Sequence, residues 1–369
     1  MQAVQSPALD APIERVTASA YKIPTDSPES DGTLEWDATT LVVVELEAGG
    51  KQGLGYTYAD GATALLIRDM LAKVVTGRKA HDSGAIYAET VAKIRNLGRD
   101  GITAMAISAI DVAVWDLRAK LADMPLAAML GMTRDAVPVY GSGGFTSYSL
   151  DKLQSQLSGW VDMGIPQVKM KVGRDAAADP RRVAAARAAI GDAQLFVDAN
   201  GGYVRKQALR LAHVFADYGV TWFEEPVYHR DLAGLRLMRD HAPPLMEISM
   251  GEYGYQALEF RNLLEAGAVD VLQADATRCG GVTGFLQADA LCDAWFMPLS
   301  SHCAPTLHLH IACAAKRLRH IEYFHDHVRI EHMLFDGAQT PVDGLLKPDL
   351  SRTGLGLEFK RADAQKFAI

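Results

Sequence analysis

Ionisable residues recur in the second part of the sequence at steps of 20 to 28 residues, each at or just after the end of a short apolar run. In order they are Lys169 with Lys171, Asp198, Glu224, Glu252, Asp275, His302 and Glu322. The carboxyl ends of the strands in a parallel barrel meet at one face, so a group repeated once per strand–helix unit is expected there. A single charge at a strand end can be merely solvated or salt-bridged, but seven units in series favour an active site.

Three carboxylates in this series, Asp198, Glu224 and Glu252, come from consecutive expected strands. They suit Mg²⁺, which prefers oxygen ligands, better than zinc, which prefers nitrogen and sulfur. The alternative is that they pair with nearby lysines. Asn200 is expected to point the same way as Asp198 on an extended strand, and either to bind the ion or to orient a ligand. Glu225, next to Glu224, is expected to point away from the pocket.

Two further groups could move protons. Lys169 and Lys171 share one strand face, and two adjacent ammonium groups near a dication are expected to lower a lysine pKa, which predicts a base. Asp275 and His302 end neighbouring expected strands, where a carboxylate would orient the imidazole and support its charge. Glu322 could hydrogen-bond a substrate oxygen if it stays protonated.

The elements that must position these residues form a strand–helix alternation with a period of about 25 residues. The expected strands cover 137–141, 167–172, 194–199, 221–225, 247–252, 271–274, 297–301 and 320–324. Ala-rich helical patterns fill the gaps, so we predict an α/β fold with a modified (β/α)8 barrel, of the TIM type, over 132–334. An open doubly wound sheet is the alternative, but no G-x-G-x-x-G motif follows a strand.

Residues 1–131 predict a separate α+β capping domain. Strand-like runs at 15–22 and 40–47 flank a polar loop, 23–39, which is expected to act as a lid and carries Trp36 as a candidate substrate contact. Helical patterns cover 62–76, 80–97 and 103–122. The last stretch, about 335–369, is expected to return toward this domain.

Composition excludes several classes of protein. The 369 residues carry 45 acidic and 37 basic side chains, for a net charge of −8, which argues against nucleic-acid binding. No apolar stretch approaches the roughly 18 residues of a membrane span, and the first residues do not resemble a secretory signal. The four cysteines form no C-x-x-C pair and are expected to be buried thiols. We therefore expect a cytoplasmic enzyme.

The motifs together resemble the enolase superfamily, specifically its mandelate racemase subgroup. The segment AISAIDVAVWDLRAKLADMPLAAMLG is similar to the capping-domain helix of that family. The barrel motifs, in order, are VKMKVG, FVDANGGY, WFEEP, SMGE, QADATRCGGVTG, LSSH and HIEYF. Each motif is weak by itself, and it is their order and spacing that make the resemblance specific.

This resemblance implies the roles of the site residues. Asp198, Glu224 and Glu252 would bind Mg²⁺, and Lys171 would be the base on one face of the substrate. The dyad of Asp275 and His302 would act on the other face. Lys169 would assist the substrate carboxylate and lower the pKa of Lys171, and Glu322 would hydrogen-bond the enolate oxygen.

The implied reaction is removal of the proton next to a carboxylate, followed by dehydration of an acid sugar. Racemisation or epimerisation of a 2-hydroxy acid, cycloisomerisation of a sugar-acid derivative and an inactive binding barrel remain as alternatives. Tyr140, at the end of the first barrel strand, is a further candidate substrate contact. The expected partners are a small carboxylate substrate and other copies of the chain, in a homo-oligomer.

Overall fold

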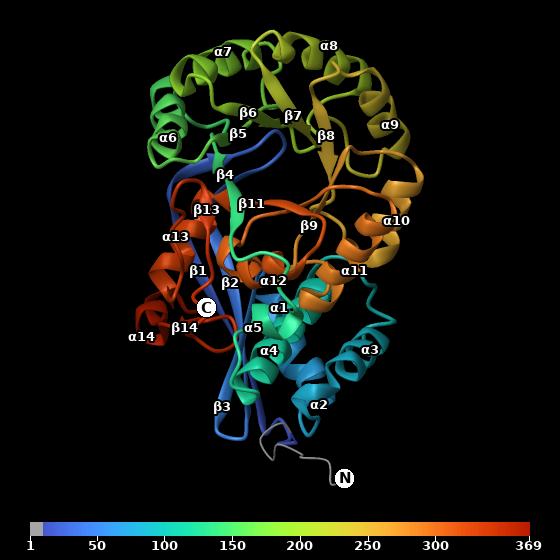
Figure 1. Ribbon diagram of the computed structural model, residues 1–369, viewed down its shortest axis with the longest axis vertical. Helices are drawn as coiled ribbons and strands as arrows, with labels where there is room; N and C mark the ends of the chain where they lie inside the picture. Colours follow the sequence, from blue (N-terminus) through green and yellow to red (C-terminus); the bar gives the residue numbers. More distant parts are fainter. Residues whose placement is uncertain (1–9) are drawn as a thin grey trace.

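The computed structural model describes residues 10–369, which form an antiparallel sheet with helices packed on it and a closed parallel barrel (Figure 1). The antiparallel sheet has the order β1 (Arg15–Ser30), β2 (Glu35–Ala48) and β3 (Lys51–Tyr58). The expected polar loop over 23–39 is wrong. Ile23 pairs with Thr39 and Ser30 with Glu35, so these residues extend the β1–β2 hairpin, with a register shift between Pro24 and Glu29.

Helices cover one face of this sheet. They are α1 (Ala62–Leu66), the π-helix η1 (Ile67–Leu71), α2 (Ala72–Val75), the 3₁₀ turn η2 (Ala80–Asp82), α3 (Ser83–Lys93), α4 (Ile102–Leu121) and α5 (Leu126–Leu130). The central contact is between α4 and β3. Gly55 lies so close to α4 that a Cβ atom there would be 2.1 Å from the carbonyl oxygen of Ala109. Only glycine permits this approach of strand and helix.

Eight parallel strands form the barrel, in sequence order, and β11 closes it on β4. They are β4 (Val137–Gly143), β5 (Gln167–Lys171), β6 (Gln194–Asp198), β7 (Val220–Glu224), β8 (Glu247–Met250), β9 (Val271–Ala274), β10 (Leu299–Ser301) and β11 (Leu318–Phe324). Each expected strand is present, and the predicted fold class is confirmed.

The barrel helices surround these strands (Figure 1). They are α6 (Leu150–Asp162), α7 (Asp179–Ile190), α8 (Arg205–Ala216), α9 (Leu232–His241), α10 (Ala257–Glu265), α11 (Gly281–Ala294), α12 (Pro305–Ala314) and α13 (His325–Leu334). Inside the barrel, the rings of Phe196 and Trp222 stack at 5.2 Å, and His320 lies against both. This aromatic layer supports the polar strand ends above it.

The chain after the barrel returns to the N-terminal sheet. Its elements are β12 (Phe335–Asp336), β13 (Leu345–Leu346), β14 (Glu358–Phe359), α14 (Arg361–Ala364) and the 3₁₀ turn η3 (Gln365–Phe367). The ring of Phe359 lies 5.4 Å from that of Tyr21 on β1, and the Ile369 amide donates to the Ala20 carbonyl at 3.1 Å. The exact domain boundary, between 131 and 132, stays a prediction. Over residues 10–369, no helix combines the length and apolar character needed to cross a membrane.

The tip of the β1–β2 hairpin lies against the carboxyl ends of the barrel strands. The Ser30 hydroxyl is 2.6 Å from that of Thr146, which follows β4. Gly32 lies against the chain that follows β6, where a Cβ atom would be 2.2 Å from the carbonyl oxygen of Ala199. The hairpin is therefore held at the end of the barrel where the charged residues collect.

Candidate active site

A group of three carboxylates lies at the carboxyl ends of β6, β7 and β8. Asp198 and Glu224 end their strands in direct register with each other. Glu252 follows β8 by two residues, after Gly251, whose φ of 145° favours glycine. One oxygen of each carboxylate lies within 4.8 Å of the other two, and all three side chains are buried. Burial, and then the neighbouring Asp198 charge, raise the pKa of Glu224 to about 8.

Two ammonium groups from β5 lie among these carboxylates. Lys169 Nζ is 2.7 Å from Glu224 Oε1 and 3.4 Å from Asp198 Oδ2. Lys171 pairs with Asp198 in the strand register, and its Nζ lies 2.5 Å from Oδ2. The three carboxylates therefore attract positive charge. The sequence left two interpretations open, a cation site and pairing with lysines, and both describe this cluster.

The side chains around Lys171 act against a lowered pKa, and the lowering expected beside a dication stays a prediction. Burial does disfavour the charge of Lys171, and Lys169 adds repulsion, but Asp198 and the other carboxylates outweigh both and raise the pKa. The prediction rests on the two like charges and a nearby dication, and the carboxylates around Lys171 act in the opposite direction. By these side chains alone, Lys171 is held as an ammonium ion.

Asp275 and His302 form a hydrogen-bonded pair, with 2.8 Å between Oδ2 and Nδ1. Burial disfavours the charge of Asp275, but the His302 hydrogen bond and charge lower its pKa to about 2. Burial likewise opposes the charge of His302, yet its surroundings, first Cys303 and then Glu252, raise its pKa well above the ordinary value. The Nε2 atom of His302 lies 3.2 Å from Glu252 Oε2. The dyad thus borders the carboxylate group at Glu252.

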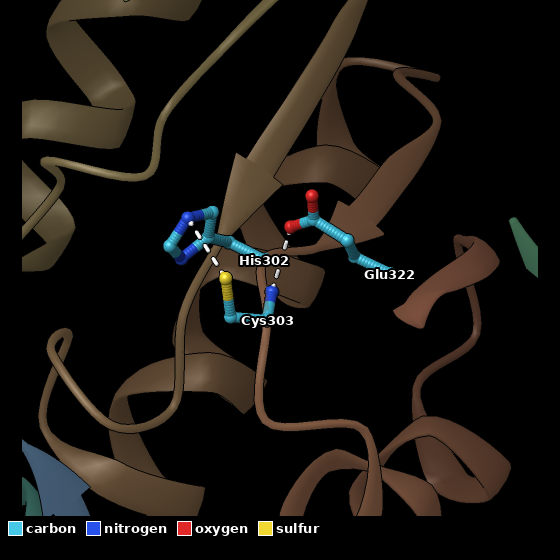
Figure 2. Close-up of side chains that lie close together, drawn as sticks. All are labelled: His302, Cys303 and Glu322. Atoms are coloured by element: carbon cyan, nitrogen blue, oxygen red, sulfur yellow. Dashed lines mark hydrogen bonds between the residues drawn. The ribbon is translucent and has the colours of Figure 1, made fainter. Parts of the chain in front are cut away.

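Glu322, on β11, lies close to this dyad (Figure 2). Its Oε2 accepts the Cys303 backbone amide at 2.8 Å, and its Oε1 lies 2.8 Å from Lys169 Nζ and accepts the Ser142 hydroxyl. Burial would raise the pKa of Glu322, but the charge of Lys169 overcomes this and lowers it. These neighbours favour the ionised form of Glu322, and a protonated Glu322 that hydrogen-bonds a substrate oxygen stays a prediction.

Cys303 contacts both His302 and Glu322. Its Sγ lies 3.3 Å from His302 Nε2, and the contact is drawn in Figure 2. The residue has a φ of 48°, and Ala304 follows with 40°, so the chain bends sharply beside the histidine. All four cysteines are buried free thiols, as the sequence predicts.

Chain bends also change the positions expected for Asn200 and Glu225. Both lie just past a strand end with a positive φ, 44° and 39°, so the alternation of an extended strand does not apply to them. The backbone N–H of Asn200 donates to Asp198 Oδ1 at 2.9 Å, while the side-chain oxygen of Asn200 is buried without a partner. Glu225 is buried, and burial, followed by the Glu252 charge, raises its pKa well above the usual range.

Tyr140 and Trp36 occupy different layers of the site. Tyr140 is fully buried in the aromatic layer of the barrel, with Lys169 Nζ 5.4 Å above its ring. Trp36, on β2, donates its indole N–H to Glu29 Oε2 at 2.9 Å. Its ring lies 5.6 Å from that of Phe145, which follows β4. Trp36 therefore borders the strand ends from the hairpin, whereas Tyr140 packs beneath them.

Arg278 is a site residue that the sequence analysis missed. Its guanidinium lies 3.5 Å from carboxylate oxygens of both Glu252 and Asp275, and it also donates to the Glu252 carbonyl at 3.1 Å. It thus joins the carboxylate group to the dyad. Its position three residues after Asp275, in the segment that follows β9, is the signal that could have identified it.

Fold and site define a (β/α)8-barrel protein of the enolase type with a capping domain. Residues 152–364 match the family described as "Enolase C-terminal domain-like". Residues 23–131 match the "Mandelate racemase / muconate lactonizing enzyme, N-terminal domain" family. The chain therefore belongs to the enolase superfamily, as a mandelate racemase/muconate lactonizing enzyme-like protein.

Individual relatives agree with this family. A mandelate racemase/muconate lactonizing enzyme-like protein from Rubrobacter xylanophilus is 52% identical, with a TM-score of 0.95, over 97% of this chain and 100% of that one. The 3,6-anhydro-alpha-L-galactonate cycloisomerase of Streptomyces coelicolor is 32% identical over 95% of this chain and 98% of its own length. An L-talarate dehydratase from Polaromonas, complexed with Mg and L-glucarate, is 31% identical, with a TM-score of 0.87, over 98% of both chains. The buried group of Asp198, Glu224 and Glu252 is consistent with a metal site.

Proposed function

We propose that this protein is a Mg²⁺-dependent lyase that dehydrates an acid sugar after removing the proton next to its carboxylate. One observation carries the proposal. The carboxylate group is bracketed by two proton-carrying side chains, Lys171 at Asp198 and His302 at Glu252. A substrate held at this group would meet one of them on each side.

The residues present suit a divalent cation. Asp198, Glu224 and Glu252 offer three oxygen ligands, and two ammonium groups already lie among them as positive charges. Burial, and then the charge of Asp198, raise the pKa of Glu224, so an added positive charge would favour its ionised form. When bound, Mg²⁺ would stabilise the negative charge that develops on the substrate carboxylate.

The proton steps follow from the chain's own residues. Lys171, once its carboxylate neighbours are neutralised, accepts the α-proton on one face. His302, oriented by Asp275, donates a proton to the leaving β-hydroxyl group on the other face, so that water departs and an enol remains. Its tautomerisation gives a 2-keto-3-deoxy acid. Lys169 stabilises the substrate carboxylate, and the ionised Glu322 holds Lys169 in place.

The hairpin supports the choice of a polyol acid. Its polar residues include Thr25, Ser27 and Ser30, whose hydroxyl groups can form hydrogen bonds. The related dehydratase from Polaromonas is seen with Mg and L-glucarate. We propose Trp36 as a specificity residue at the hairpin side, Asn200 as a residue that orients Asp198, and Tyr140 as packing beneath Lys169.

Cycloisomerisation of a sugar-acid derivative is the second candidate, because the Streptomyces coelicolor cycloisomerase aligns over nearly the whole chain. The same two proton carriers would serve it, with ring opening in place of water loss. Racemisation would need one of them to remove the α-proton and the other to deliver a proton to the opposite face. An inactive barrel is disfavoured because every acid–base position is filled.

A homo-oligomeric state and a cytoplasmic location stay predictions.

A panel of acid sugars, their lactones and 2-hydroxy acids, incubated with Mg²⁺ in deuterated buffer, tests this proposal. Nuclear magnetic resonance would show deuterium uptake at the α-carbon and the identity of the product. We expect a 2-keto-3-deoxy acid, formed with Mg²⁺ and abolished by a chelator. A product with no loss of water would establish the isomerase alternative, and no exchange with any compound would overturn the proposal.

A further inference from the structure

A second cluster of metal-binding side chains lies outside the barrel site, where the hairpin meets the barrel. Asp26 and Glu29 come from the register shift in β1, and His325 is the first residue of α13, directly after β11. One carboxylate oxygen of each acid and a ring nitrogen of His325 all lie within 4.8 Å of one another. His325 Nε2 is 2.9 Å from Asp26 Oδ2.

Glu29 is the unusual member of this cluster. Its side chain is fully buried, its Oε2 accepts the Trp36 indole, and its Oε1 has no hydrogen-bond partner. Asp198 and Glu322 are buried to the same degree, but each has a lysine ammonium within 3 Å. Burial, followed by the nearby Asp326 charge, raises the pKa of Glu29 to about 8. A buried carboxyl group with a free oxygen and no cation is costly unless something binds it.

The nearby basic side chains, Arg329 and Lys152, contact groups other than Asp26 and Glu29. Arg329 donates to Asp326 at 3.0 Å and to the Pro24 carbonyl at 2.7 Å. Lys152 donates to the Ser27 hydroxyl, with its Nζ 4.0 Å from the ring centre of Tyr148. Neither forms an ion pair with Asp26 or Glu29 in the described structure (residues 10–369). Asp26 and Glu29 therefore have no lysine or arginine ion-pair partner among the described residues.

We propose that Asp26, Glu29 and His325 form a second metal site, which binds a transition dication such as Zn²⁺ and fastens the hairpin to the barrel. One nitrogen and two oxygen ligands suit Zn²⁺, which commonly takes three protein ligands and a water. Mg²⁺ prefers oxygen alone and would remain at the barrel carboxylates. The ligands belong to segments 296 residues apart, 29 and 325, so one ion would tie the substrate-facing hairpin to the end of β11. Binding would displace the proton from Glu29.

Zinc titration in excess Mg²⁺ tests this site independently of the proposed reaction. Full-length wild-type protein, Glu29→Gln and His325→Gln would be compared by calorimetry, with Glu35→Gln as the control from the same hairpin. Glu35 is exposed and pairs with Arg174, so its loss leaves the cluster intact. We expect one zinc ion per wild-type and control chain, and at least about a tenfold weaker affinity in both ligand variants.

Crystals of the wild-type protein soaked in Zn²⁺ and Mg²⁺ provide the second measurement, which does not depend on the variants folding. Anomalous scattering at the zinc edge should give a peak bounded by Asp26, Glu29 and His325. A zinc peak only at the barrel carboxylates, or equal zinc affinity in wild type and both ligand variants, would overturn the proposal. Neither result would bear on acid-sugar dehydration, which the Mg²⁺ assay tests separately.

Discussion

The ring of charged strand ends and the β1–β2 hairpin place their acidic side chains by different means. In the barrel, main-chain pairing sets the positions, since Lys171, Asp198 and Glu224 are register partners across β5, β6 and β7. In the hairpin, the pairing slips where Glu29 lies, and side-chain contacts decide its position. The barrel carboxylates have cations within reach, whereas Glu29 has none. Lys171, Asp198 and Glu224 thus rest on regular backbone, whereas Glu29 lies where the strand pairing is interrupted.

Removing one barrel carboxylate should produce the largest effect. We expect Glu252→Gln to lose Mg²⁺ binding in calorimetry and to slow α-proton removal by about 10³-fold or more, because the developing charge is no longer neutralised. Glu247→Gln is the matched control, since Glu247 lies at the other end of β8 and pairs with Arg319. Wild-type Mg²⁺ affinity in Glu252→Gln would remove this residue from the metal site.

Loss of the dyad carboxylate should have the next largest effect. Asp275→Asn keeps the shape but removes the acceptor charge that helps raise the pKa of His302. The pKa of His302 should fall, so the imidazole loses its proton at a lower pH. The alkaline limb of the pH–rate profile should therefore shift to lower pH. We expect about a 10²-fold slower reaction at neutral pH. An unchanged pH profile would mean that Asp275 does not act through the histidine.

A change in the hairpin should alter recognition and spare the chemistry. Trp36→Ala should raise KM about tenfold or shift the preference among acid sugars, while α-proton exchange with a good substrate survives. Trp36→Phe, which keeps an aromatic ring against Phe145, is the control. If kcat fell in Trp36→Ala and KM stayed the same for all substrates, Trp36 would act in the chemistry of the barrel site and not in substrate recognition by the hairpin.

The buried Glu29 should make the stability of the protein depend on pH. Its pKa, about 8 in the folded protein against 4.5 ordinarily, means that the folded state binds the extra proton between these values. Stability should therefore fall as pH rises from 5 to 8, by up to about 1.4 kcal/mol per pH unit. Calorimetric unfolding with a chelator present should show a shallower fall for Glu29→Gln. Parallel curves for the two proteins would show that Glu29 is not held protonated.

The sequence was sufficient to predict the parts of the fold and site that are built on regular strands. Eight apolar runs, seven of them with ionisable residues at their ends, predicted the barrel and brought the three carboxylates and the dyad together. It failed where the backbone leaves the strand pattern: Asn200 and Glu225 have left-handed φ values, and polar residues concealed the extension of the hairpin. The charge states of Lys171 and Glu322 depend on distances of about 3 Å, which no spacing along the chain reveals.

Hydrogen–deuterium exchange at the substrate α-carbon tests the central claim, two proton carriers on opposite sides of one metal-binding group. His302→Asn should lose turnover by about 10²–10⁴-fold, yet keep α-exchange for the stereoisomer whose proton faces Lys171. Lys171→Ala should lose exchange of that proton. Exchange of the same stereoisomer at wild-type rates by both single variants would contradict the account, because neither residue would then be the base.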